Sequence, residues 1–129
     1  MNKNLSITAL LGVIAIVLGA FAAHSLKESL STEAMESLTT GIRYQMYHVI
    51  VLLFVNTYSG FSDRFKNRVS LFLFLGILFF SGSIYAIYLL GVPAKSIWFV
   101  TPLGGLLFII GWLLMFILFL KKGFAKKSE

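Results

Sequence analysis

The chain has no cysteine and few charged side chains. Without cysteine there is no disulfide, no thiolate nucleophile, no iron–sulfur cluster and no thiolate zinc site. Charged residues make up 12% of the 129 residues, whereas soluble domains contain about 25%. Hydrophobic side chains make up 58%. Together these values exclude an ordinary soluble domain.

Asp, Glu, Lys and Arg are absent from four long intervals, residues 4–26, 44–62, 69–94 and 96–120. Leu, Ile, Val, Phe, Ala and Gly dominate all four. A helix needs about 20 apolar residues to cross the hydrocarbon layer. The pattern therefore predicts an all-α integral membrane protein, a four-helix bundle that forms one domain over residues 1–129. The expected spans are residues 5–24, 42–59, 69–90 and 97–120.

The segment between the first two spans has a helical pattern of its own. Apolar side chains recur every four residues, at Leu26, Leu30, Ala34, Leu38 and Ile42. Ser31 or Thr32 would cap a helix here, with Glu33 favourably placed in its first turn. We expect a short amphipathic helix on the outer surface of the membrane. The alternative is a helical loop packed over the end of the bundle.

Positive charge is unevenly distributed around the predicted spans. Eight of the 11 basic residues fall on one side of a four-pass chain: Lys3, Arg64, Lys66, Arg68, Lys121, Lys122, Lys126 and Lys127. Because positive loops stay in the cytoplasm, both termini are expected to be cytoplasmic, in a bacterial cell (inner) membrane. The basic residues adjoin membrane segments, so their expected partners are anionic lipids, and nucleic-acid binding is not expected. A second copy or another membrane protein is a further possible partner.

Small residues lie at helical spacing in three spans. Helix association in lipid depends on close packing, so these residues are expected to form helix-packing surfaces. The set comprises Gly12, Ala15, Gly19, Gly76, Gly82, Gly104, Gly105 and Gly111.

Polar side chains gather at the predicted outer ends of the spans. Gln45, His48 and Asn56 fall along one stripe of the second span, which must face protein because unpaired polar groups are costly in hydrocarbon. Four segments thus contribute to one outer polar region, which is the candidate ligand-binding site. Its members are His24, Arg43, Tyr44, Gln45, His48, Ser83, Tyr85 and Thr101.

Several interpretations of this region stay open. It could be a hydrogen-bonded lock that fixes helix register, or a pocket for a lipid headgroup, quinone or metabolite with Arg43 as anion partner. Arg43 could instead snorkel to the surface or pair with Glu36. Haem ligation by His24 and His48 is a third option. Without a third His, Cys or carboxylate the metal signature is weak, so no metal or cofactor is expected.

Catalysis and ion coupling have less support. His48 and Tyr85 could form an acid–base pair, but no nucleophile–base–orienter trio accompanies them, so no catalytic residue is predicted. No Asp or Glu lies within any span. Carriers driven by protons or sodium commonly use a buried carboxylate, so a small ion-coupled carrier is disfavoured.

Four ordered blocks of the chain resemble a known family. They are residues 19–27 (GAFAAHSLK), residues 44–48 (YQMYH), residues 80–85 (FSGSIY) and residues 101–105 (TPLGG), the last followed by Gly111-Trp112. They resemble the family called domain of unknown function 423, small four-span membrane proteins whose eukaryotic relative is transmembrane protein 256. One departure is Ser25, where the family often has alanine.

The resemblance implies a four-helix membrane protein and brings no activity, substrate or cofactor. The residues that recur in the family overlap the outer polar region found from predicted depth. They correspond here to His24, Tyr44, Gln45, His48, Ser81, Gly82, Ser83, Tyr85, Thr101, Pro102, Gly104 and Gly105.

The expected function is a non-enzymatic membrane module that binds a lipid-like ligand or a partner helix through the outer polar region. A small-solute transporter is the alternative. A membrane-embedded enzyme acting on a lipid or quinone is the second alternative.

Overall fold

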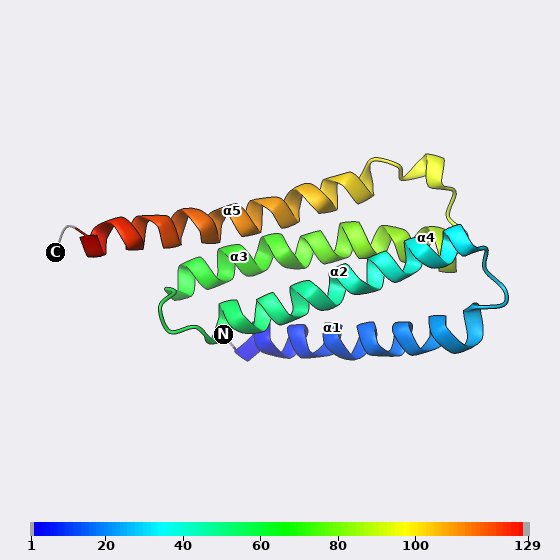
Figure 1. Cartoon of the computed structure of the whole chain (residues 1–129), viewed down its shortest axis with the longest axis horizontal. Coiled ribbons are helices and arrows are strands. Elements are labelled where there is room, and N and C mark those ends of the chain that lie inside the picture. Colours follow the sequence, from blue (N-terminus) through cyan, green and yellow to red (C-terminus); the bar gives the residue numbers. More distant parts are fainter. Residues whose placement is uncertain (1, 128–129) are drawn as a thin grey trace.

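The computed structural model describes residues 2–127, in which helices are joined by short loops and no strand occurs (Figure 1). The first helix, α1 (Asn2–Phe21), continues through a one-turn π-helical segment, η1 (Ala22–Leu26). The second helix is α2 (Thr32–Thr57). The third comprises α3 (Asp63–Gly76), a second π-helical segment, η2 (Ile77–Ser81), and α4 (Gly82–Leu89). A short 3-10 turn, η3 (Ala94–Ser96), precedes the fourth helix, α5 (Val100–Lys127).

Four helical stretches are long and apolar enough to cross a membrane: Lys3–Leu26, Thr32–Thr57, Asp63–Leu89 and Val100–Lys127. The predicted all-α, four-span architecture is therefore confirmed. Large apolar side chains cover the outside of the helices; Leu10 is 59% exposed and Ile16 is 65% exposed. In water this surface would be unfavourable, whereas in a bilayer it faces lipid tails.

The segment before the predicted second span does not form a separate amphipathic helix. The Ser31 hydroxyl accepts a hydrogen bond from the Ala34 N–H (3.1 Å), as expected of a cap, and the helix then runs without interruption to Thr57. Its apolar face is buried against protein, since Leu38 is almost fully buried and Gly41 contacts Ile84 of α4. Packing within the bundle therefore accounts for Leu38 and Gly41, whereas Leu30 and Ile42 line a space toward α1.

The helices lie side by side in chain order (Figure 1). α1 packs on α2, α2 packs on the third helix, and α5 packs on the other side of the third helix. The beginning of α1 and the end of α5 lie at one end of the bundle, which we call the terminal end. The loops at residues 27–31 and 90–99 lie at the other end, which we call the far end.

The apolar core lies where α2, the third helix and α5 meet. Leu52 and Val55 of α2 pack with Leu73 of α3 and with Phe108 and Met115 of α5. All five are buried within the helix bundle. α2 and the third helix are thus each packed on two sides, whereas α1 and α5 flank the bundle and expose most of their length.

Glycines set the closest helix approaches. A Cβ added at Gly104 of α5 would lie 2.7 Å from the Phe80 Cα, so α5 meets the backbone of η2 directly. A Cβ at Gly76 would overlap the Phe108 ring, and one at Gly111 would lie 2.7 Å from the Leu73 Cδ2. At these crossings any residue with a Cβ would displace a neighbouring atom, as expected for helix association by close packing.

The other small residues pack less tightly. An added Cβ at Gly12 or Gly19 would lie 3.4 Å or 3.8 Å from a side chain of α2, and Ala15 is buried. At Gly105 the nearest neighbour is the Phe80 ring at 3.9 Å. Gly82 differs from the expectation, because the atoms nearest to an added Cβ belong to its own helix, at Leu78 and Ile77. Gly82 therefore opens no approach to a neighbouring helix.

We predict that Gly104→Ala destabilises the protein by about 1–3 kcal/mol, because the added methyl group meets backbone that cannot rotate away. Thermal unfolding in detergent followed by circular dichroism measures the change. Gly123→Ala is the matched control, since an added Cβ there meets nothing within 4 Å. Equal stability of the two variants would contradict the close crossing of α5 and η2.

Candidate functional site

Gln45 of α2 forms hydrogen bonds to α1 and to the third helix. Its amide is 1% exposed. The Nε2 donates to the Leu11 carbonyl of α1 (2.7 Å), and the Oε1 accepts from the Tyr85 hydroxyl of α4 (2.6 Å). A backbone carbonyl can only accept, so the orientation of the amide is determined. Both polar ends of Gln45 are therefore used within the protein.

His48 connects α2 to α5. Its Nε2 accepts from the Trp112 indole N–H (3.1 Å), and its Nδ1 donates to the Tyr44 carbonyl (2.7 Å). An indole can only donate and a carbonyl can only accept, so the imidazole is the neutral tautomer with the proton on Nδ1. The ring stacks on Phe108 with centroids 3.7 Å apart. Both ring nitrogens and one ring face are thus occupied by protein.

Two serines of the third helix complete the polar contacts near the far end. The buried Ser81 hydroxyl donates to the Gly41 carbonyl of α2 (2.6 Å). The Ser83 hydroxyl is hydrogen-bonded to Thr101 of α5 and donates to the Phe80 carbonyl (2.9 Å). Ser81 lies in η2, at the level where Gly104 approaches the backbone. The π-helical segment is therefore the point where α2, the third helix and α5 are joined most directly.

Two of the predicted site residues lie apart from this network, since His24 is exposed in η1 and Arg43 is exposed on α2. Tyr44 contributes its carbonyl to His48, whereas its ring is exposed and lies with its centroid 5.0 Å from that of Phe80. The structure brings together Gln45 with Tyr85 and Ser83 with Thr101. It gives His48 a partner, Trp112, that was not among the predicted residues.

The histidines do not form a ready-made metal or haem site. Binding through His48 would first break its hydrogen bond to Trp112 or to Tyr44. Among residues 2–127 no group of three or more His, Cys, Asp or Glu side chains is positioned to hold a metal ion. Haem ligation through His48 would require the same break of a hydrogen bond.

A second polar cluster lies at the terminal end. The Asn4 Nδ2 donates to Asn56 (3.0 Å) and to Asn67 (2.9 Å), and the Asn56 Nδ2 donates to the Ser70 hydroxyl (2.8 Å). These contacts join α1, α2 and α3. The sequence pattern placed Asn56 on the protein-facing stripe but gave no signal for Asn4, Asn67 or Ser70, which come from distant segments.

No buried side-chain nitrogen or oxygen in the described part of the chain lacks a hydrogen-bond partner. The hydrogen bonds between helices are those that the lock interpretation expects, and ligand binding at these residues stays a prediction. A ligand that took the place of one of these partners would have to break its hydrogen bond.

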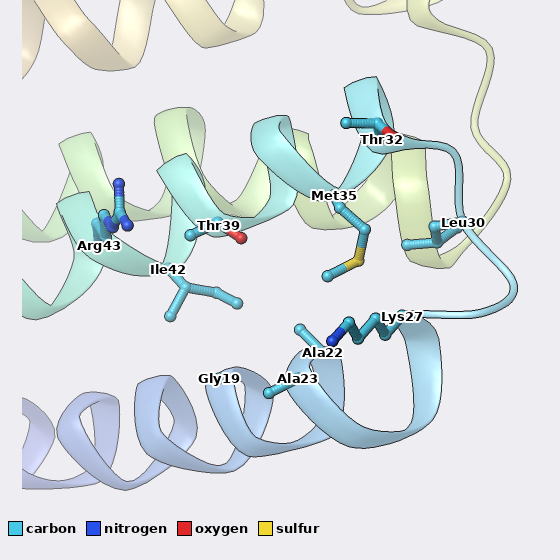
Figure 2. Close-up of a pocket in the computed structure, with 10 residues that line it drawn as sticks. All are labelled: Gly19, Ala22, Ala23, Lys27, Leu30, Thr32, Met35, Thr39, Ile42 and Arg43. Atoms are coloured by element: carbon cyan, nitrogen blue, oxygen red, sulfur yellow. The ribbon is translucent and has the colours of Figure 1, made fainter.

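A hollow of about 590 Å³ lies between α1 and α2 at the far end (Figure 2). We call it the far-end groove. Its α1 wall is made of Gly19, Ala22 and Ala23, whose small side chains leave space between the helices. Figure 2 shows Met35 and Ile42 of α2 pointing into this space.

Lys27 places a positive charge in the far-end groove. Figure 2 shows its side chain turned back between the two helices, so that its amine lies beside Ala22 and Ala23. Arg43 lines the other end of the hollow, and its guanidinium points away from α1. Lys27 was not among the predicted site residues, because the sequence places it only in the loop after the first span.

We predict that the effects of Gln45→Leu and Tyr85→Phe on the free energy of unfolding are coupled. Each variant alone leaves a buried polar group unpaired, whereas the double variant removes both partners. The coupling free energy should be about 0.6–1.7 kcal/mol, as for other hydrogen bonds between membrane helices. Unfolding of the four proteins of the double-mutant cycle in detergent measures it. Additive effects within error would contradict a direct hydrogen bond.

Comparison with known proteins places the chain in a family. The model of the family described as "Protein of unknown function (DUF423)" matches residues 18–105. A "UPF0382 membrane protein" of Haemophilus influenzae is 43% identical over 113 residues, which cover 87% of this chain and 89% of that protein. A protein of the same name from Staphylococcus epidermidis is 42% identical over 121 residues, covering 94% of this chain and 98% of that protein.

The "UPF0382 inner membrane protein YgdD" of Escherichia coli is 36% identical over 117 residues, which cover 84% of this chain and 82% of that protein. No solved structure matches the chain. The resemblance carried by the four sequence blocks is thus confirmed. Because the family model spans most of the sequence and the relatives align over most of their own length, this chain belongs to the DUF423 family of membrane proteins.

Proposed function

We propose that this protein is a non-enzymatic membrane module that binds a lipid-like ligand in the far-end groove. The main support is Lys27, whose amine is turned into a hollow with largely apolar walls. Among residues 2–127 the structure gives this amine no ion-pair or hydrogen-bond partner. An amphiphile with an anionic headgroup would supply the missing negative charge and would cover the apolar walls.

The size and composition of the groove agree with such a ligand. Ligand pockets in proteins are typically about 300–1,000 Å³ with mostly apolar walls and a few polar groups. The groove has about 590 Å³, with Lys27 and two threonines among its lining residues. This proposal moves the ligand from the predicted polar region, where hydrogen bonds are already satisfied, to the adjoining groove between α1 and α2.

Arg43 is a second positive charge that favours an anion site at the far end. It lines the far-end groove and also an adjoining hollow of about 570 Å³ along the first turns of α2. Glu36 shares the second hollow, but the two side chains form no ion pair within residues 2–127. The guanidinium is therefore available to a phosphate at the membrane surface.

The carrier and enzyme alternatives have less support from the geometry. A polar pathway along α2 would use Gln45, His48 and Asn56, and each of these is hydrogen-bonded to a neighbouring helix. The Tyr85 hydroxyl, one member of the conceivable acid–base pair, donates to Gln45. No observation on the described residues favours either alternative over ligand binding.

We further propose that the protein lies in a bacterial inner membrane with both termini in the cytoplasm. The distribution of basic residues supports this orientation, because eight of the 11 lie at the terminal end. The far-end groove would then open at the outer leaflet. Its ligand would be a lipid of that leaflet.

We predict that Lys27→Gln lowers the retention of an anionic phospholipid by about fivefold, as expected for the loss of about 1 kcal/mol per basic residue near a charged surface. Native mass spectrometry of the protein released from nanodiscs of phosphatidylglycerol and phosphatidylcholine measures the bound lipid. Lys27→Arg should retain the lipid. Lys95→Gln, which removes a charge from the same end outside the groove, is the matched control.

Equal lipid retention by Lys27→Gln and the parent protein would contradict a headgroup site at Lys27. A similar loss in Lys95→Gln would show that the far end attracts anions without a defined groove site.

We predict opposite labelling of two single-cysteine variants, because the natural chain has no cysteine to interfere. Ser96→Cys, in the exposed far-end loop, should react with a membrane-impermeant maleimide in intact cells. Ser59→Cys, in the loop at the terminal end, should react only after the membrane is permeabilised. The reverse labelling pattern would place both termini outside.

A further inference from the structure

A second groove lies on the lipid-facing side of the bundle, between α2 and α5, and has a volume of about 310 Å³. Its walls include Ile50 and Phe54 of α2 and Trp112 and Phe116 of α5. Buried Met115 forms part of its lining. We call it the terminal-half groove. It does not overlap the far-end groove, which lies between α1 and α2.

Side-chain contacts close this groove at both ends. Toward the far end, the Trp112 indole bridges α5 and α2 by its hydrogen bond to His48. Toward the terminal end, Tyr58 stacks on Phe54 with ring centroids 5.3 Å apart and approaches Phe119 at 6.2 Å. The groove is therefore a short, closed trough that opens sideways toward lipid.

The closed ends of the trough limit what can occupy it. Because Trp112 bounds it on one side and Tyr58 on the other, it offers no continuous groove for the side chains of a neighbouring helix. A flexible hydrocarbon chain fits such a space. Its walls are almost entirely apolar, and Ile50 and Phe116 are each 60% exposed.

Lys122 supplies a positive charge next to Tyr58, the side chain that closes the terminal end of the groove. Its amine lies 5.9 Å from the centroid of the Tyr58 ring and 5.7 Å from that of Phe61, and it donates to the Gly60 carbonyl. An ammonium group has three donors, so one hydrogen bond leaves two for a headgroup. The aromatic rings and the loop carbonyl thus hold the amine at this end of the groove, whereas Lys121 makes no such contact within the described residues.

We infer that the terminal-half groove holds one acyl chain of a phospholipid whose anionic headgroup contacts Lys122. The apolar walls favour a hydrocarbon chain, the closed ends favour a short flexible occupant over a helix, and the amine held beside Tyr58 favours a negative charge. This site is independent of the far-end groove and of the function proposed for it. It makes the protein selective for anionic lipid at the terminal end, through one particular lysine rather than through the basic tail as a whole.

Trp112 provides a reporter inside the groove, since the chain has only two tryptophans. Trp98→Phe removes the other one, which lies in the far-end loop. This variant is reconstituted into bilayers that contain phospholipids brominated on the acyl chains, because bromine quenches tryptophan fluorescence on contact. Quenching is compared between brominated phosphatidylglycerol and brominated phosphatidylcholine at equal mole fractions.

We predict that phosphatidylglycerol is preferred at Trp112 by about fivefold, and that Lys122→Gln abolishes this preference. Lys122→Arg should keep it. Lys121→Gln, which removes the same charge one residue away, should leave it intact. Unchanged Trp112 emission in each variant shows that the fold is preserved.

Three outcomes would overturn the inference. Equal quenching by the two lipids would show that no headgroup is selected. Equal loss of preference in Lys121→Gln and Lys122→Gln would assign it to the charge of the tail in general. Absence of quenching by either lipid would show that protein, such as a second copy, covers the groove.

Discussion

Polar side chains buried in hydrocarbon must be satisfied within the protein, and in this molecule the rest of the structure depends on how α2 meets that requirement. Gln45 bonds to α1 and α4, His48 bonds to α5, and Asn56 bonds to α1 and α3. Each bond has a defined direction, because carbonyls only accept and the indole only donates. Apolar packing alone distinguishes poorly between helix registers in lipid. The polar stripe of α2 is therefore what aligns the four helices.

Glycine contacts and hydrogen bonds act at the same level of the bundle. Gly104 lets α5 touch the backbone of η2, and Ser81 of η2 donates to the Gly41 carbonyl. A tight crossing at this level leaves helices farther apart elsewhere. The two grooves lie away from this crossing, one between α1 and α2 at the far end and one between α2 and α5 toward the terminal end. Lys27 lines the far-end groove, and Lys122 lies beside Tyr58 at the end of the other groove.

The polar region expected from the sequence is joined by hydrogen bonds inside the bundle. Gln45, His48, Ser83, Tyr85 and Thr101 were grouped by predicted depth, and all five do have polar partners there. A ligand at these groups would have to displace one of those partners. Lys27 and Lys122 could not be identified in this way. A lysine beside a membrane segment has the same sequence signature whether its side chain enters solvent or turns into a groove.

The sequence by itself determined the environment and the architecture, because helix length, the absence of charge and the distribution of basic residues act locally along the chain. It also determined that one stripe of α2 must face protein. Only the tertiary structure decided which groups form hydrogen bonds with the polar side chains of that stripe, since the partners Leu11, Trp112 and Asn4 come from distant segments. It likewise decided that residues 32–41 extend the second span, because Leu38 and Gly41 are buried against a neighbouring helix. An apolar face has the same periodicity against lipid as against protein, and only packing distinguishes the two.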